Sequence, residues 1–195
     1  IRSLNGTKVT ENSNYPYYFT GTKFKFFGKE YTVLYIHENG YINFTSGDNT
    51  YFQNTYSNQF NNFRLSAFFG NLINNSSTTE TNQADIYIGF GKYNELVITF
   101  NNFSAIQLDP NNISSTVSNN YNNFQIRIWL ENSKTHTDPT LTYSDDYYPK
   151  GTIQVCYGKC EYQKPLIGLS NNITYDETTY SPLNFGSLSY INYDI

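Results

Sequence analysis

The sequence offers few side chains whose types and spacing could support catalysis. Glycoside hydrolysis needs only two carboxylates at a fixed separation, and Asp85, Glu95, Asp145 and Asp146 could supply them. Nothing in their spacing selects a pair. A zinc-protease helix motif, a phosphate-binding glycine loop and a serine-hydrolase elbow are all absent from the sequence. We therefore expect a protein that is not an enzyme, with a carboxylate-based glycoside hydrolase as one alternative.

Patterns for metals and cofactors are equally weak. His37 and His136 lie about a hundred residues apart, and His37 adjoins a predicted turn, which favours a surface position. Residues 47–49 (Gly-Asp-Asn) and 144–146 (Ser-Asp-Asp) carry oxygen ligands that calcium prefers, but neither has the spacing of a calcium loop. We interpret these carboxylates as solvated turn residues. The sequence predicts neither a bound metal nor a cofactor.

Two cysteines, Cys156 and Cys160, enclose three residues of which the central one is Gly158. If Gly158 turns the chain, the two Cα atoms can approach the ~5.5 Å that a disulfide prefers. A metal site would need two more ligands, and a redox pair usually has two intervening residues rather than three. The spacing therefore predicts a structural disulfide, which implies an oxidising compartment.

Asparagine is abundant, and several positions match the Asn-X-Ser/Thr acceptor pattern for N-glycosylation. With about 28 Asn in the chain, chance alone gives about five or six such matches, so the seven observed permit glycosylation without implying it. Positions in predicted loops are better acceptors than Asn43, which lies in a predicted strand. The candidate positions are Asn5, Asn43, Asn74, Asn75, Asn102, Asn112 and Asn172.

Composition narrows the classes of partner. Charged residues are only 14% of the 195 and the net charge is −4, and no cluster of Lys and Arg of the kind that binds nucleic-acid phosphates is visible in the sequence. The high aromatic content, 18%, argues against disorder. No apolar run approaches the ~20 residues that span a bilayer, so we expect no membrane insertion.

The composition also bears on location. The chain has no Met and begins at Ile1-Arg2, which predicts proteolytic processing or removal of a signal peptide, with an incomplete chain as the alternative. Ser, Thr, Asn and Tyr are enriched while Lys and Arg together number 12. This balance favours a secreted protein, so we expect an extracellular or cell-surface location.

Residues 24–44 contain the clearest structural pattern and predict a central β-hairpin. Gly28 marks a first turn, and residues 31–36 then alternate as a strand. Residues 37–40 (His-Glu-Asn-Gly) reverse the chain into residues 41–44, because Asn-Gly tolerates the positive φ angles of tight turns. The other strands are expected to assemble on this hairpin.

The rest of the chain alternates short apolar segments with polar connections, and no window predicts an amphipathic helix. Many short strands joined by Gly, Asn and Pro turns indicate an all-β fold, an antiparallel β-sandwich that is jelly-roll-like with long loops. We predict one domain over residues 1–195, with residues 172–195 as an extended C-terminal tail or strand. Further strands are predicted within residues 1–18, 63–69, 84–90, 95–100, 124–130, 152–157 and 166–169, and connections at 46–62, 71–83, 104–122 and 131–150.

The order of these motifs resembles the nidogen-like (NIDO-type) extracellular module. FFGKEYTVLYIHENGYINF resembles its opening signature, and RLSAFFGNL resembles the segment that follows. ADIYIGFG and ELVITFNNF are similar to its middle hairpin, and NNFQIRIWLEN to its long core strand. GTIQVCYG and PLIGLSN resemble the strand and turn that close related modules. The resemblance spans residues 24–171.

Several positions depart from this pattern. Asn71 stands where the family commonly has Asp, residues 46–62 and 104–122 are long insertions, and the tail after Asn172 has no counterpart. Such modules occur in adhesive or matrix proteins and share no catalytic site. The resemblance therefore implies extracellular, non-enzymatic use.

Together these observations predict a structural or adhesive module, a subunit of a surface matrix, coat or filament. Its partners would be other copies of itself or other extracellular proteins, and residues 172–195 could add a strand to the exposed sheet edge of a neighbour. The leading alternative is a glycan-binding adhesin that uses exposed Tyr residues or Trp129 with loop Asn and Asp. The hydrolase ranks after it.

Overall fold

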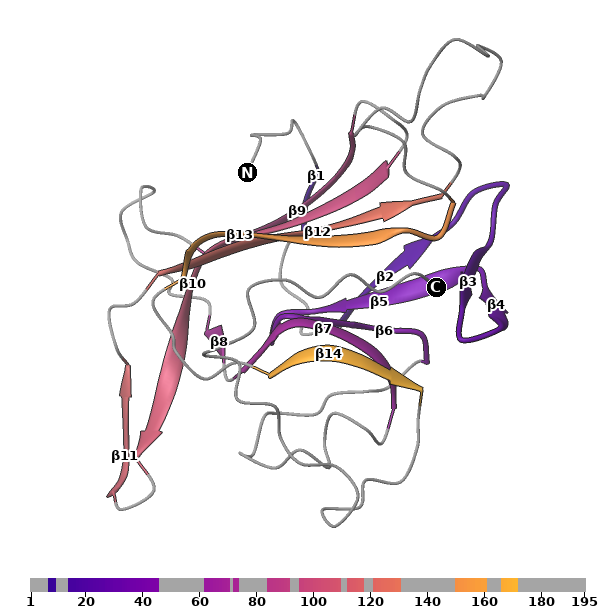
Figure 1. The fold of residues 1–195 in the computed structure, drawn as a ribbon. Coiled ribbons are helices and arrows are strands. Elements are labelled where there is room, and N and C mark those ends of the chain that lie inside the picture. The colour runs from indigo at the N-terminus through magenta and orange to yellow at the C-terminus, as the bar shows by residue number, and fades with distance from the viewer. Residues whose placement is uncertain are drawn as a thin grey trace, which may run out of the picture.

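The chain folds into two antiparallel β-sheets that face each other across one core (Figure 1). This confirms the antiparallel β-sandwich predicted from the sequence. The computed structural model describes the residues of both sheets and their shorter connections. The described ranges are 7–9, 14–45, 62–70, 72–73, 84–91, 95–109, 112–117, 121–130, 150–160 and 166–171.

The first sheet contains both strand pairs that are consecutive in the chain and pairs that are not. The hairpin partners β9 and β10 are followed across the sheet by β12 and then β13, and β1 pairs with the opposite edge of β9. In order, its strands are β1 (Thr7–Val9), β9 (Asp85–Phe90), β10 (Glu95–Asp109), β12 (Asn122–Trp129) and β13 (Ile153–Cys160).

The second sheet contains the predicted central hairpin. β5 and β6 pair with His37 opposite Tyr41, and they occupy the middle of the sheet as expected. In order, its strands are β14 (Leu166–Asn171), β7 (Phe63–Phe69), β6 (Tyr41–Asn43), β5 (Val33–His37) and β2 (Asn14–Tyr18). A separate small hairpin joins β3 (Phe24–Phe26) to β4 (Lys29–Tyr31).

The core forms because alternate residues of each strand point between the sheets. Leu34 and Ile36 of β5 contribute from the second sheet, and Ile98 and Ile126 contribute from the first. Stacked aromatic rings strengthen the contact between sheets, as where Phe68 lies 5.2 Å from Phe124. The described part of the chain contains no helix with the length and apolar character needed to cross a bilayer.

Residues 104–122 differ from their predicted role as a loop. β10 continues to Asp109, and β11 (Asn112–Val117) returns beside it, so the predicted turn at residues 109–112 joins two strands. Figure 1 shows this hairpin reaching beyond the sandwich at the lower left. β8 (Leu72–Ile73) also pairs with β10 in this region. The prediction was wrong because most residues of β11 are polar and the turn cluster at residues 109–112 favours a loop, so the sequence pattern does not reveal the two strands on either side of it.

Candidate functional site

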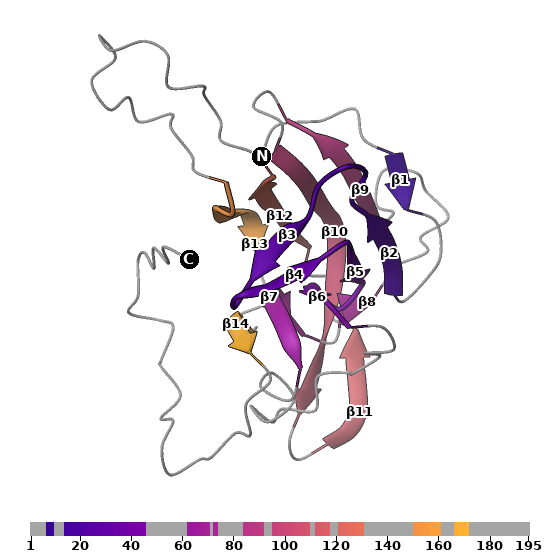
Figure 2. The ribbon, with the colours of Figure 1, turned by 90° about the vertical axis from the view of Figure 1, so that its right-hand side faces the viewer.

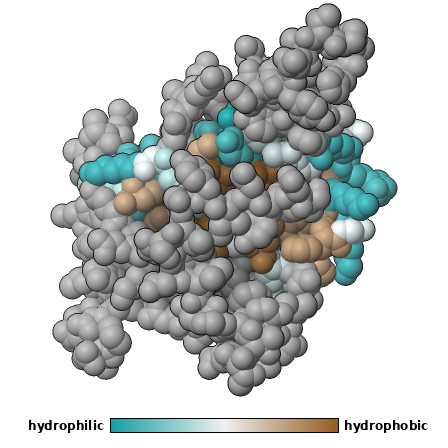
Figure 3. Space-filling view, in the orientation of Figure 1, coloured by the Kyte–Doolittle hydropathy of each residue, from teal (hydrophilic) through white to brown (hydrophobic). Residues whose placement is uncertain are grey.

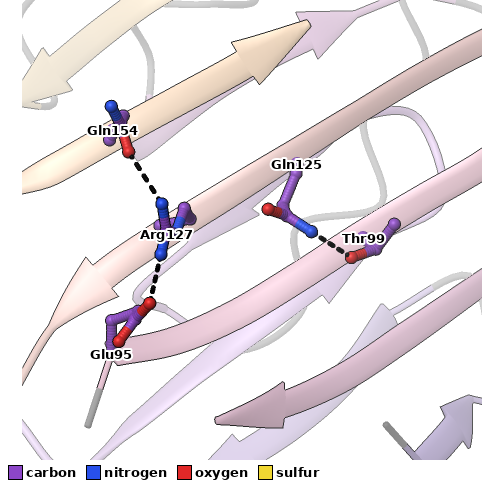
Figure 4. Close-up of polar contacts among 5 residues, drawn as sticks. All are labelled: Glu95, Thr99, Gln125, Arg127 and Gln154. Atoms are coloured by element: carbon purple, nitrogen blue, oxygen red, sulfur yellow. Dashed lines mark hydrogen bonds and ion pairs between the residues drawn. The ribbon is translucent and has the colours of Figure 1, made fainter. Parts of the chain in front are cut away.

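A strip of polar side chains crosses the outer face of the first sheet (Figure 4). Antiparallel pairing places Thr99 opposite Gln125 and Arg127 opposite Gln154. The Gln125 amide donates to the Thr99 hydroxyl at 2.8 Å, and the Arg127 guanidinium donates to the Gln154 side-chain oxygen at 3.3 Å. These residues alternate with the core residues of β10 and β12, so the same period of two that builds the core also builds the strip.

Arg127 is the centre of this strip. Its guanidinium donates to the Glu95 carboxylate and lies 5.2 Å from the centre of the Trp129 ring. The Glu95 side chain is fully buried, whereas the Arg127 side chain is 21% exposed. A Cβ atom at Gly91 would overlap the Glu95 carboxylate, so glycine leaves the space that the carboxylate fills. This ion pair joins β10 to β12, and the hydrogen bond of Arg127 to Gln154 extends the link to β13.

The two described carboxylates among the candidates for glycoside hydrolysis, Asp85 and Glu95, lie far apart. Asp85 pairs across the sheet with Asn101, and Glu95 lies six residues away along β10. At about 3.4 Å per residue this is about 20 Å, whereas glycosidase pairs lie about 5–10 Å apart. The Asp85 carboxylate accepts a hydrogen bond from the Tyr87 hydroxyl at 3.1 Å. Asp145 and Asp146 lie outside the described residues.

His37 is not the surface residue that its place beside a turn predicted. It is fully buried, its ring stacks on Tyr41 at 4.4 Å, and its Nδ1 accepts a hydrogen bond from the backbone N–H of Asn39 at 3.1 Å. The prediction was wrong because the turn residues fold back against β7, where Gly70 donates to the Asn39 carbonyl. His136 lies outside the described residues.

Sequence reasoning missed a buried polar cluster on the outer face of the second sheet. Arg64 is fully buried, and its guanidinium lies 4.4 Å from the Tyr41 ring and 4.8 Å from the Phe69 ring. Asn43, which pairs with Arg64, is also fully buried, and neither polar atom of its side-chain amide has a hydrogen-bond partner among the described residues. The one available signal was a lone arginine inside the apolar segment FRLSAFF.

Cys156 and Cys160 are both free thiols in the structure. Gly158 does not turn the chain; β13 continues through it, with a shift of its register on β12 between Tyr157 and Cys160. The predicted disulfide is therefore absent here, and the oxidising compartment that it implied loses this support. The Cys160 thiol donates to the Asn123 carbonyl at 3.4 Å, and burial raises the pKa of Cys160.

Of the glycosylation positions, two have described side chains. Asn43 is fully buried on β6, where no glycan could be accommodated without opening the sheet. Asn102 is partly exposed and has a φ of 58°, and its backbone N–H donates to the Asn123 side chain at 2.9 Å. Asn112 is the first residue of β11. The remaining positions, Asn5, Asn74, Asn75 and Asn172, lie outside the described residues.

β13 forms one edge of the first sheet and carries a link to the second sheet. Figure 2 shows β13 and β14 at the same side of the sandwich, one above the other. The Tyr157 hydroxyl on β13 donates to the Ala67 carbonyl on β7 at 2.6 Å, although the residue as a whole is 44% exposed. Burial of this hydroxyl, with further contributions from Cys160 and Cys156, raises the pKa of Tyr157 well above its usual value.

Large hydrophobic side chains are exposed at several separate places. They are aromatic side chains that lie at one end of β2, at the turn of the β3–β4 hairpin, at the end of β9 and in the middle of β13. Scattered exposed apolar residues are ordinary, but aromatic rings are also the side chains most enriched at protein interfaces. The residues are Tyr18, Phe27, Phe90 and Tyr157.

Among the residues that the structure describes, no group of three or more His, Cys, Asp or Glu side chains could hold a metal ion. Comparisons of the chain with models of protein families, with curated protein sequences and with solved structures find no match.

Proposed function

We propose that this chain is a non-enzymatic module of an extracellular structural or adhesive assembly, which it joins by strand addition at the β13 edge. The observation that carries the proposal is the side of β13 on which no described strand pairs. The low charge of the chain and its resemblance to nidogen-like modules support the same use. The carboxylates of Glu30, Asp85 and Glu95 and the guanidinium of Arg127 are engaged in contacts within the chain, which favours binding over catalysis.

The direction of the β13 backbone groups follows from the bonds at the start of the strand. The Trp129 N–H donates to the Thr152 carbonyl and the Gly151 N–H donates to the Trp129 carbonyl, so both backbone groups of Trp129 point toward β13. In an antiparallel pair these directions alternate. Gln154 and Cys156, opposite Arg127 and Gln125, therefore point their backbone groups toward β12.

The residues between them point the opposite way. By the same alternation, Ile153, Val155 and Tyr157 direct their N–H and C=O groups away from β12, to the side where the sheet has no further described strand. Exposed edges of this kind are templates for pairing with another chain. An extended segment of a second copy, or of another extracellular protein, would continue the ladder there.

The outer strands β1, β2 and β14 are less suited to strand addition. β1 has only three residues, and β2 carries Pro16, which lacks a backbone N–H. β14 follows Pro165 and shifts register between Leu166 and Gly168. In β13, by contrast, residues 153–157 pair with β12 without a shift. The exposed Tyr157 ring would contact an added strand.

The test compares assembly in two variants of Val155. Val155→Pro removes an edge-facing N–H and leaves the ladder to β12 complete, as proline permits on an edge strand. Val155→Ala removes a similar amount of side-chain packing but keeps the N–H. Electron microscopy and sedimentation velocity of the purified chain would follow assembly, and urea unfolding would confirm that both variants fold.

The proposal predicts ordered oligomers for the wild-type chain and for Val155→Ala, and monomers for Val155→Pro. A wild-type chain that stays monomeric at high concentration would contradict self-assembly. Oligomers that persist unchanged in Val155→Pro would show that a different surface makes the contact.

A further inference from the structure

The β3–β4 hairpin concentrates positive charge in a chain whose net charge is −4. Four of the nine lysines of the sequence lie on it or beside it, and all four are exposed. The only acidic residue of the hairpin is Glu30, whose carboxylate accepts a hydrogen bond from Lys23 at 2.9 Å. The lysines are Lys23, Lys25, Lys29 and Lys150.

Three of these lysines act on the same carboxylate although Lys150 is distant in sequence, whereas the ammonium group of Lys29 lies 4.4 Å from the centre of the Phe63 ring. The pKa of Glu30 is lowered mainly by the hydrogen bond and charge of Lys23, and the charges of Lys25 and Lys150 lower it further. Lys25 lies directly opposite Glu30 in the hairpin. One carboxylate therefore faces three ammonium groups, and the described residues of this end keep an excess of positive charge.

An aromatic ring stands at the tip of the same hairpin. Phe27 and Gly28 form the two-residue turn with φ values of 46° and 76°, a conformation that usually selects Asn, Asp or Gly. Phe27 instead carries a ring that is 40% exposed. Phe26 supports this ring from the core side, with centres 4.6 Å apart and planes at 73°. The sequence thus places an apolar surface where turn geometry favours a small polar residue.

Figure 3 shows hydrophilic residues (teal) beside hydrophobic residues (light brown) at the right-hand end of the molecule, where Figure 1 places β3 and β4. A flat apolar ring can contact the apolar face of a sugar, and ammonium groups form charge-assisted hydrogen bonds with carboxylate or sulfate groups. We propose that the Phe27 turn and its surrounding lysines bind an anionic polysaccharide.

Other anionic partners fit this surface less well. Sites for single-stranded nucleic acid combine a basic groove with several stacking rings, whereas the hairpin tip offers one exposed ring. Binding to a membrane surface needs a larger apolar face than a single half-exposed Phe provides. The proposed polysaccharide site does not include the β13 edge, so the two proposals can be tested independently of each other.

The experiment measures binding of three polysaccharides by isothermal titration calorimetry. Heparin fragments carry sulfate and carboxylate groups, polygalacturonate carries carboxylate alone, and dextran is neutral. We expect binding to at least one anionic polysaccharide and none to dextran, with affinity falling as salt rises, because exposed charges are screened. Comparing heparin with polygalacturonate shows whether sulfate is required.

Three variants locate the site. Phe27→Asn removes the ring but suits the positive φ, so the hairpin stays folded, and we expect a loss of affinity of about fivefold or more. Lys25→Gln should weaken binding by about threefold and reduce its salt dependence. The matched control Lys159→Gln, on the exposed part of β13, should bind like the wild-type chain. Val155→Pro should also bind normally.

Binding to neither anionic polysaccharide would overturn the proposal, as would unchanged affinity in both Phe27→Asn and Lys25→Gln. Vesicles containing phosphatidylserine and an oligodeoxythymidylate are measured in parallel. Binding to either of these with higher affinity than to both anionic polysaccharides would replace the polysaccharide with that partner.

Discussion

Gly40 illustrates how strongly a single residue constrains the central hairpin. It has a φ of 83°, its N–H donates to the His37 carbonyl, and its own carbonyl accepts from both Ala67 and Phe68. Two successive N–H groups on one acceptor are the sign of a β-bulge in β7. A Cβ atom at Gly40 would overlap the Phe68 backbone carbonyl. Glycine is therefore required here for both conformation and space.

This argument predicts different costs for two alanine substitutions. Gly28 has a similar φ of 76°, but no atom lies within 4 Å of its added Cβ. Gly28→Ala should lower the free energy of unfolding by about 1–2 kcal/mol, the cost of a left-handed conformation. Gly40→Ala should lower it by about 3 kcal/mol or more, because the backbone must also move. Equal costs in urea unfolding would contradict the close contact.

The ion pair of Arg127 with Glu95 gives a second prediction at the scale of the residue. Arg127→Met keeps much of the side-chain volume but leaves the fully buried Glu95 carboxylate without its cation. Removing one partner of a buried pair typically costs about 3–5 kcal/mol. Because Arg127 is partly exposed, we expect the lower part of that range.

The control is the double variant Glu95→Gln with Arg127→Met. It removes the buried charge together with its partner, so it should recover much of the stability lost in Arg127→Met. A double variant that is less stable than the single one would show that Glu95 contributes through other contacts.

At the scale of the elements, Tyr157 links the edge strand of the first sheet to β7 of the second. The register of β14 on β7 shifts next to Ala67, and such a shift leaves ladder groups without their usual partner. The Tyr157 hydroxyl donates to the Ala67 carbonyl from the opposite sheet. This hydrogen bond therefore connects β13 to β7 at the point where the register of β14 on β7 shifts.

This link predicts a pH dependence of stability. The pKa of Tyr157 is raised in the folded chain, whereas unfolded tyrosine loses its proton near its ordinary value of 10.0. Above that pH the unfolded state binds fewer protons than the folded state, so stability falls as pH rises. Below it, the contribution of Tyr157 is fully present.

Tyr157→Phe isolates this contribution. At neutral pH it should lower the free energy of unfolding by about 1 kcal/mol, the typical worth of one hydrogen bond. Between pH 9 and pH 11 its stability should fall less steeply than that of the wild-type chain. Tyr17 and Tyr31, whose pKa values burial also raises, remain in both proteins. Parallel pH profiles would contradict the assigned role.

The elements that the sequence predicted well are those with a strong apolar period. The β5–β6 hairpin and the β9–β10 hairpin place alternate residues in the core, and this alternation is visible before folding. β11 pairs with the second half of β10 through backbone groups, and most of its side chains are polar, so its sequence carries little periodic signal. Gly158 suggested a turn, but a glycine also tolerates a strand, and the pairing of β13 with β12 decides between them.

At the scale of the whole molecule, the sequence could not predict which polar residues become buried. Arg64 and Glu95 lie at alternate positions of their strands, where the pattern predicts a solvated face. Their burial depends on what packs over each outer face, which is a tertiary property. The edge position of β13 is likewise set by the order of strands, and sequence patterns carry little information about that order.

The same limit applies to function. Motif searching found no catalytic constellation, and the structure separates Asp85 from Glu95 on the first sheet. The proposed functions depend instead on the open side of β13 and on the charged tip of the β3–β4 hairpin. Both are surfaces defined by topology and exposure, and neither requires a recognisable motif.

Hydrogen–deuterium exchange resolved at single amides tests the central proposal most directly. At low protein concentration, the amides of Gln154 and Cys156 should be protected by β12, whereas those of Ile153, Val155 and Tyr157 should exchange quickly. As the chain assembles at higher concentration, these three amides should become protected. Fast exchange of the same three amides within the assembled protein would contradict strand addition at β13.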